Sequence, residues 1–362
     1  MIFKKANKRN LISNIILVVL FIVFCLSVQN NGSLLWNQII SKVLIFSIAA
    51  LALNIVCGCL GEFALGHGGF LLIGYTAAVI VAGYMREAIG TSTFRDIIYS
   101  NKEGLQALGY LVISSDVLIA AIITGIFGLI VGLISLARLK GDYLAIVTLG
   151  ISLIFVNLGK NIEFIGGAQG TAIVSKLRGT TLIYGILLVL AIFLILAFMK
   201  SRFGRSILAC RDDNIAAEAC GVAVNKYKVL AFTFSAFIAG LAGGLYAHFN
   251  SFKPIDFGQD LSIELLIIVV LGGLGSLTGS IFASFVIVFY NLWFCTRAWV
   301  PAFFASNPKI IYGVILVAIM LFRSKGILGT SEFTWNWFYD KIQLVWNKII
   351  KIFKKKTPKE VE

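Results

Sequence analysis

The chain has 362 residues, of which 59% are hydrophobic and only 13% are charged. Soluble domains usually carry about 25% charged residues, so this composition excludes a water-soluble globular protein. A formal charge of +14 would favour nucleic-acid binding in a soluble protein. In a membrane protein the informative property is instead the side of the membrane on which the basic residues lie.

Ten apolar runs along the chain predict transmembrane helices. The runs are continuous and about 17 to 25 residues long, which is the length that crosses a bilayer as a helix. A β-barrel would instead show alternating segments of about ten residues. We expect an all-α polytopic membrane protein with helices near residues 11–28, 36–59, 68–85, 111–137, 143–159, 181–199, 227–247, 261–275, 279–297 and 310–322.

The positions of the basic residues predict the orientation, because Lys and Arg gather on the cytoplasmic side of membrane proteins. With the N-terminus inside, most of the 31 basic residues fall on the inner side. We therefore expect both termini in the cytoplasm. Three regions follow, namely a basic N-terminus over residues 1–10, a membrane domain over 11–330 and a basic tail over 331–362.

Two Gly-rich segments interrupt the apolar runs. The first break, residues 61–70, reads GEFALGHGGF, and the second break, residues 271–280, reads LGGLGSLTGS. Irregular backbone at membrane depth must be buried in protein or line a water-filled cavity. The residues of interest are Glu62, Gly66, His67 and Gly68 in the first break, and Gly272, Gly273, Gly275 and Gly279 in the second.

Few ionisable residues are expected at membrane depth, and we single out Glu62, His67, His248 and Glu264. Such groups usually face a cavity or a partner. Structural interpretations are also open: Glu62 and His67 can hold the first break together by hydrogen bonds. His248 can lie at the outer interface, and Glu264 can reach water near the outer surface. No chain of carboxylates of the kind that an ion pump needs is present.

The longest internal cytoplasmic segment runs from residue 200 to 228. Asp213 and Asn214 give a helix-capping signal, an Ala-rich stretch follows, and Gly221 can end the helix. A short helix with small side chains suits docking into a groove on a soluble partner. An ordinary surface loop is the alternative.

The C-terminal tail alternates Lys with aromatic and aliphatic residues over 334–356. This pattern predicts an amphipathic helix that contacts membrane lipid on the anionic inner leaflet. A disordered tail is the alternative interpretation.

Motifs for catalysis are missing from the chain. It contains no Gly-x-x-x-x-Gly-Lys-Ser/Thr, no Gly-x-Ser-x-Gly and no Cys-x-x-Cys. We therefore expect a protein that is not an enzyme, with no bound cofactor, no metal site and no nucleic-acid partner.

Four segments in order resemble one family. Residues 211–249 read RDDNIAAEACGVAVNKYKVLAFTFSAFIAGLAGGLYAHF, and they resemble the permease subunits of bacterial branched-chain amino acid ABC importers, the LivM-like branch. Segments 65–78, 139–150 and 262–285 agree with the same family. The resemblance runs from about residue 45 to 325.

The resemblance implies a multi-pass protein of the bacterial cytoplasmic membrane, with residues 11–330 as the permease domain. It also implies a second homologous permease subunit, two cytoplasmic ATP-binding subunits that use ATP and Mg²⁺, and an extracytoplasmic solute-binding protein. The two breaks would then line or hinge a pathway for branched-chain or related amino acids.

The segment 200–228 resembles the coupling segment of ABC importers, whose pattern is Glu-Ala-Ala-x-x-x-Gly. Ala216, Ala217 and Gly221 match this pattern, but Ile215 stands where Glu is expected, which leaves the role of Glu218 open. The resemblance implies an ATPase-coupling set of Arg211, Ala216, Ala217, Glu218 and Gly221. In the second break Ser280 replaces the usual Pro, which questions where the next helix starts.

Other functions remain as alternatives at this point. A permease for urea, amides or another small solute would carry the same family features. An ion-coupled secondary transporter would need inverted repeats and coupling carboxylates, and neither is evident. A membrane-embedded enzyme would need a catalytic constellation, which the chain lacks.

Overall fold

The computed structural model describes residues 8–89, 103–136, 141–162, 167–169, 180–249 and 253–294, together with scattered positions between 311 and 329. All regular structure in these residues is helical, which confirms the all-α expectation. The α-helices are α1 (Lys8–Asn31), α2 (Leu34–Asn54), α3 (His67–Ile89), α5 (Glu103–Ser135), α6 (Asp142–Lys160), α7 (Thr180–Lys200), α8 (Arg202–Asp212), α9 (Asn214–Ala219), α10 (Val224–Phe249), α11 (Gln259–Gly272) and α12 (Leu277–Phe289). Shorter turns are the π-helices η1 (Ile55–Leu60) and η5 (Tyr290–Phe294) and the 3₁₀-helices η3 (Gly167–Gln169) and η4 (Pro254–Phe257).

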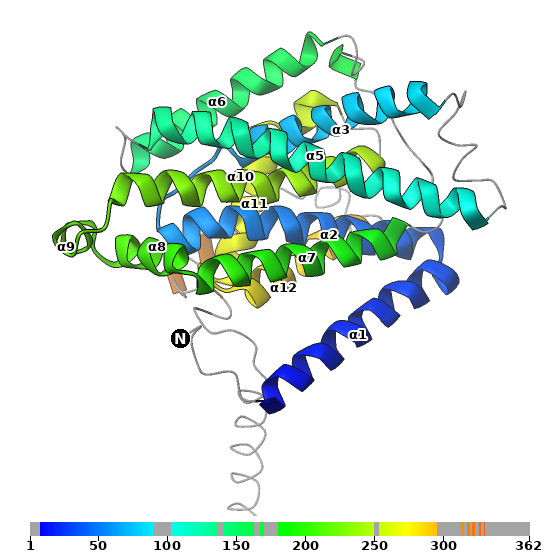
Figure 1. Ribbon diagram of the computed structural model, residues 1–362, viewed down its shortest axis with the longest axis horizontal. Helices are drawn as coiled ribbons and strands as arrows, with labels where there is room; N and C mark the ends of the chain where they lie inside the picture. The colour runs from blue at the N-terminus through cyan, green and yellow to red at the C-terminus, as the bar shows by residue number, and fades with distance from the viewer. Residues whose placement is uncertain are drawn as a thin grey trace, which may run out of the picture.

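The long helices form a bundle. In Figure 1, α2, α5, α7 and α10 run along the long axis of the molecule, and α10 packs against both α5 and α2. Helices α8 and α9 lie together at one end of the bundle, on the left of Figure 1. Helix α1 diverges from the bundle and packs mainly against α7.

Helix α2 and its continuation η1 form the core of the bundle. Every residue from 43 to 60 is buried. The sequence explains this position, because the segment is apolar on all sides, and a helix that is hydrophobic all round is buried rather than amphipathic. The core is therefore built around the helix that leads directly into the first break.

Small residues let α10 approach its neighbours closely. A β-carbon on Gly243 would lie 2.2 Å from the backbone oxygen of Leu71 in α3, and one on Gly74 would lie 2.7 Å from that of Gly240. Glycine allows this backbone contact, which is a common way for helices to associate in membranes. Helix α3, which begins inside the first break, is thereby packed closely against α10.

The outward faces of several helices are apolar. Ile122 of α5, Ile146 of α6 and Phe193 of α7 are all exposed on the surface of the isolated chain. A water-soluble protein rarely exposes such a continuous apolar surface, whereas lipid solvates it. The chain is a multi-pass membrane protein.

Seven helices within the described residues are long and apolar enough to cross a membrane. They correspond to the spans expected near 36–59, 68–85, 111–137, 143–159, 181–199, 227–247 and 279–297. The span expected near 261–275 is α11, whose 14 residues extend about 21 Å at 1.5 Å per residue, less than the hydrocarbon core of about 30 Å. The second break therefore shortens a helix within the bundle.

Helix α1 covers the expected first span, although its described apolar part is short. The tenth span falls largely outside the described residues, and so do residues 1–7 and the tail from 331 to 362. The count of ten spans and the cytoplasmic placement of both termini remain predictions.

Candidate functional site

The first break begins where α2 continues into the π-helical turn η1. Gly61 ends this turn with a φ of +81°, a left-handed conformation that favours glycine. The next residues, through Gly66, have no regular structure, and α3 begins at His67. Single π-turns inside helices occur frequently at functional sites.

Gly66 and Gly68 lie in positions where the neighbouring backbone leaves no space for a side chain. A β-carbon on Gly68 would lie 2.3 Å from the backbone oxygen of Phe257, and one on Gly66 would lie 2.9 Å from that of Thr148. Neither glycine has a positive φ. The structure thus packs the first break tightly against η4 and α6, and a hinge or pathway role for these glycines remains a prediction.

His67 anchors the start of α3. Its Nε2 lies 2.7 Å from Oγ of Ser235 in α10, and that hydroxyl donates to the backbone oxygen of Ala52 at 2.6 Å. The His67 ring also meets Phe70 and Phe232 edge-on. The expected hydrogen bonding of His67 is confirmed, and it ties α3 to α10 and α2.

Glu62 lies at the bundle end that carries α8 and α9. Its carboxylate accepts a hydrogen bond from Nζ of Lys228 in α10 and a weaker one, at 3.4 Å, from the backbone N–H of Gly141. The expected hydrogen bonding of Glu62 is therefore also confirmed. Lys228 was counted only as a cytoplasmic charge in the sequence, yet its side chain is 5% exposed.

The second break turns the chain between α11 and α12. Gly273 and Gly275 have φ of +115° and +87°, values that favour glycine. Gly272 and Gly279 pack so closely that a β-carbon on either would lie within 2.5 Å of the other's backbone. Ser276 then caps α12, since its Oγ accepts the N–H of Gly279 at 3.1 Å.

Ser280 does not disturb the start of α12. The helix begins at Leu277, three residues earlier, and the N–H of Ser280 donates to the backbone oxygen of Ser276 at 3.2 Å. A proline at this position could not make that bond. The doubt that the missing proline raised about this helix start is resolved.

Asn54, the last residue of α2, connects η1 to the second break. Its Nδ2 donates to the backbone oxygen of Ser276 at 3.0 Å and to Oγ of Ser280 at 3.1 Å. Its Oδ1 accepts the N–H of Gly275 at 2.8 Å. The side chain is fully buried. Sequence reasoning missed Asn54, because it lies inside an apolar run and its partners are more than 220 positions away.

The segment 200–228, which we call the coupling segment, contains α8, α9 and the start of α10. Asp213 caps α9 by accepting the N–H groups of Ile215 and Ala216 at 2.8 and 3.2 Å. Gly221, with a φ of +82°, follows the last turn, so the helix expected here is present with the expected ends. The sequence signals at both ends were sufficient to find it.

The coupling residues divide between the interior and the surface. Ala217 is buried against Cys210 and Val224, whereas Ala216, Glu218 and Gly221 are exposed. Ile215, which stands where the family pattern has Glu, has 81% of its surface exposed. Helix α9 therefore presents small side chains, the apolar side chain of Ile215 and the carboxylate of Glu218 to the outside of the bundle.

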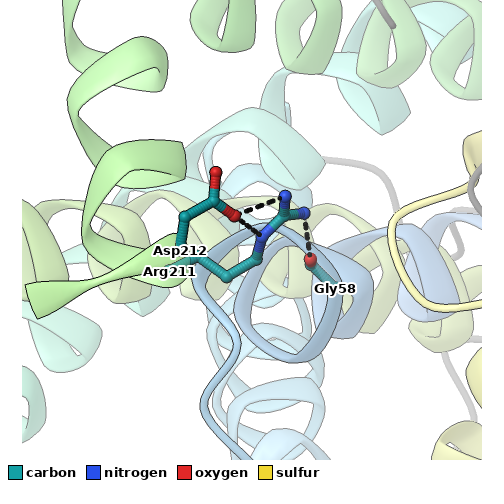
Figure 2. A network of polar contacts seen from close by, with 3 residues as sticks. All are labelled: Gly58, Arg211 and Asp212. Atoms are coloured by element: carbon teal, nitrogen blue, oxygen red, sulfur yellow. Dashed lines mark hydrogen bonds and ion pairs between the residues drawn. The ribbon is translucent and has the colours of Figure 1, made fainter.

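Arg211 points the other way, toward the bundle. Figure 2 shows its guanidinium between Asp212 and the backbone oxygen of Gly58 in η1. The Nε and Nη2 groups donate to Oδ1 of Asp212 at 3.1 and 2.9 Å, and Nη1 donates to Gly58 at 3.3 Å. Of the predicted coupling residues, Arg211 is the one that the structure joins to the core.

Residues 35–321 match the family model described as the permease component of branched-chain amino acid transport systems. The chain belongs to this family. The permease is 30% identical over 331 residues to the high-affinity branched-chain amino acid transport system permease protein LivM of Escherichia coli K12, a match that covers 82% of this chain and 70% of the relative.

Two other relatives also match. The high-affinity branched-chain amino acid transport system permease protein LivH of Salmonella typhimurium is 22% identical, with 79% of this chain and 92% of the relative covered. The autoinducer 2 import system permease protein LsrC of Klebsiella pneumoniae is 37% identical over 107 residues, which are 28% of this chain and 31% of the relative. No solved structure matches the permease.

The permease also contains a buried ionisable pair that was not predicted. Nε2 of His248 in α10 lies 2.8 Å from Oδ2 of Asp116 in α5, and both side chains are at most 1% exposed. His248 lies one residue before the end of α10, and the α5–α10 contact encloses its side chain, so its position at the outer interface remains a prediction. Asp116 was overlooked although it falls inside the expected span 111–137. Glu264 is half-buried in the second turn of α11.

A metal centre finds no support within the described part of the permease, where no three His, Cys, Asp or Glu side chains lie together as a metal-binding group. The polar contacts instead join helices. The first break, the second break and the coupling segment all meet η1, through Gly61, Asn54 and Arg211 respectively.

Proposed function

We propose that this chain is the transmembrane permease subunit of an ATP-driven importer of branched-chain or related amino acids. Family membership over residues 35–321 supports the permease role. The observation that carries the proposed coupling to ATP hydrolysis is the placement of α9. This capped helix has exposed small residues and lies beyond the end of the bundle. Because the chain has no ATP-binding motif, the energy source must be another subunit that contacts such a surface.

The proposed assembly contains a second homologous permease subunit, two cytoplasmic ATP-binding subunits and an extracytoplasmic solute-binding protein. In this assembly the end of the bundle with α8 and α9 faces the cytoplasm. The exposed Arg202, Arg205 and Lys226 at this end agree with the cytoplasmic excess of basic residues in membrane proteins. ATP hydrolysis in the partners would switch a pathway beside the two breaks between outward and inward access.

The docking surface of α9 is defined by its small exposed side chains. Ala216 leaves room for a close approach by a groove, and the exposed Ile215 offers apolar surface whose burial in a pocket would favour binding. Among the described residues, nothing lies within 4 Å of a β-carbon built on Gly221, although its φ of +82° favours glycine. A bulky residue at the exposed Ala216 would therefore obstruct the approach of a partner.

The variant Ala216→Trp tests the docking role, because Ala216 is exposed and helical, so tryptophan meets no steric conflict within the chain. We expect the two ATP-binding subunits to be lost on affinity purification of the permease and amino-acid uptake to disappear. Ala168→Trp is the matched control, since Ala168 is exposed in η3, beyond the opposite end of α6. Normal assembly and uptake with Ala216→Trp would refute the docking surface.

Two measurements separate the proposal from its alternatives. Uptake into liposomes by the purified chain without ATPase partners would establish an ion-coupled transporter. A thermal-shift screen of the partner binding protein against amino acids, urea and amides would identify the substrate class. We expect stabilisation by leucine, isoleucine or valine and no uptake without the ATPases.

A further inference from the structure

We propose that η1 is the element that transmits movement of the coupling segment to the second break, with Arg211 and Asn54 as the residues that position it. This inference rests on the proposed docking of α9 to an ATPase. It names the path by which docking would act on the membrane-embedded part of the permease. Three sets of contacts around η1 carry it.

The first contact joins the coupling segment to η1. Arg211 lies at the end of α8, two residues before the cap of α9, and its Nη1 donates to the backbone oxygen of Gly58 (Figure 2). Asp212 holds the same guanidinium through two further hydrogen bonds, which fix its orientation. A displacement of α8 would therefore act through Arg211 on the backbone carbonyl of Gly58, which belongs to the buried core.

The second contact joins η1 to the second break. A β-carbon on Gly58 would lie 2.1 Å from Oδ1 of Asn54 and 2.2 Å from the backbone nitrogen of Gly275. Asn54 in turn hydrogen-bonds Gly275, Ser276 and Ser280. Gly58 is thus in direct contact with the turn between α11 and α12, with no space to absorb a shift. Because packed cores resist continuous deformation, a shift on one side of η1 must move the other side.

The third contact holds the first break from both ends of the coupling segment. A β-carbon on Gly61 would lie 2.8 Å from Cγ of Arg211, which precedes α9. Glu62 accepts a hydrogen bond from Lys228, which follows α9 on α10. Arg211 before α9 and Lys228 after it therefore both contact the residues that directly follow η1. Such a position agrees with the frequent occurrence of single π-turns at functional sites.

The sharpest test compares Arg211→Gln with Arg205→Gln in the complete complex reconstituted with its ATPases and binding protein. Both arginines are exposed on α8 and both changes remove one charge, but Arg211 alone of the two contacts η1. We expect Arg211→Gln to keep ATPase association and basal hydrolysis, and to lose about tenfold of uptake and of substrate-stimulated hydrolysis. Arg205→Gln should behave as the unaltered complex.

Asn54→Ala tests the contact between η1 and the second break. The thermal stability of this variant in detergent is measured together with its transport activity. We expect uptake and stimulation to fall about tenfold at a temperature where the variant stays folded. If Arg211→Gln and Asn54→Ala both keep uptake and stimulation within about twofold, the proposal is overturned. Loss of ATPase association with Arg211→Gln would also overturn it, by making Arg211 part of the docking surface.

The modification rate of the native cysteines in η1 reports its movement. If η1 had a purely structural role, this rate would not change between nucleotide states. Cys57 and Cys59 lie within η1 and are buried. In a variant whose other cysteines are serine, we expect their rate of modification by N-ethylmaleimide to change when the ATPases are trapped with nucleotide and vanadate. Arg211→Gln should abolish that change. Equal modification rates with and without trapped nucleotide in the parent complex would show that η1 does not move and would overturn the proposal. Failure of the docking proposal is a separate outcome, seen as normal assembly of Ala216→Trp.

Discussion

Lys228 in α10 donates a hydrogen bond to Glu62 in the first break, although 166 positions separate the two residues in the sequence. Both side chains are largely withdrawn from solvent, with 5% and 12% exposed. A buried ion pair contributes little net stability, but removal of one partner leaves a charge without compensation. The pair therefore fixes where the first break lies relative to the coupling segment.

Charge reversal at this pair should destabilise the fold and an exchange should repair it. We expect Glu62→Lys or Lys228→Glu alone to cost about 3–5 kcal/mol, because each places two like charges together in a buried site. The exchanged variant Glu62→Lys with Lys228→Glu should recover more than half of that loss. Thermal unfolding in detergent measures both effects, with the exposed Lys226→Glu as control. An exchanged variant as unstable as the single variants would contradict the pairing.

Gly68→Ala should disrupt the packing of the first break. The added methyl group would lie 2.3 Å from the backbone oxygen of Phe257, which cannot rotate away as a side chain can. We expect a loss of about 1–3 kcal/mol and a lower unfolding midpoint. Gly150→Ala is the matched control, since no described residue outside its own helix turn lies within 4 Å of its β-carbon and alanine favours a helix interior by up to about 1 kcal/mol. Equal midpoints for the two variants would show that the close contact is not maintained.

The thiols of the coupling segment should differ strongly in reactivity. Cys220 is exposed after α9, whereas Cys210 is buried and burial raises its pKa, an effect that nearby Lys228 partly offsets. Because the thiolate is the reactive form, a raised pKa lowers the reactive fraction at neutral pH and the rate increases as pH rises toward that pKa. In a Cys295→Ser background, we expect a maleimide to modify Cys220 at least about tenfold faster than Cys210, with the difference narrowing at alkaline pH.

The same labelling reports on docking. Binding of the ATPases should protect Cys220, because it directly follows the helix that is proposed to enter the partner. Mass spectrometry of the labelled peptides measures the two thiols in one sample. Faster modification of Cys210 than of Cys220, or full labelling of Cys220 in the assembled complex, would contradict the arrangement.

Hydropathy and capping signals predicted much of this fold, because both are local properties of the chain. The apolar runs located the seven spanning helices, and the Asp213 and Gly221 signals located α9 with its ends. The two breaks were also found, since a cluster of glycines inside an apolar region is visible in the sequence itself. The family resemblance then supplied the interpretation of these pieces.

The contacts between these pieces could not be predicted in the same way. Asn54 is a single polar residue in an apolar run, and its partners Ser276 and Ser280 are known only once α2 and α12 are placed side by side. Lys228 was counted as a cytoplasmic charge because its sequence neighbours Lys226 and Tyr227 fit the edge of a span. Long-range pairing of this kind leaves no local pattern in the sequence, because its partners are brought together only by the packing of distant helices.

The Asp116–His248 pair should prove to be a structural contact rather than part of the transport route. Among the described residues, neither Oδ1 of Asp116 nor Nδ1 of His248 has a hydrogen-bond partner, so the pair is isolated between α5 and α10. We expect Asp116→Leu or His248→Phe alone to cost about 3 kcal/mol in detergent unfolding, because each leaves one buried polar group without its partner. The double variant Asp116→Leu with His248→Phe should recover most of that stability and keep amino-acid uptake, since apolar residues can replace a buried pair at little net cost. A double variant that is stable but inactive would instead place the pair in the transport cycle, and one less stable than either single variant would show that the pair itself is strongly favourable.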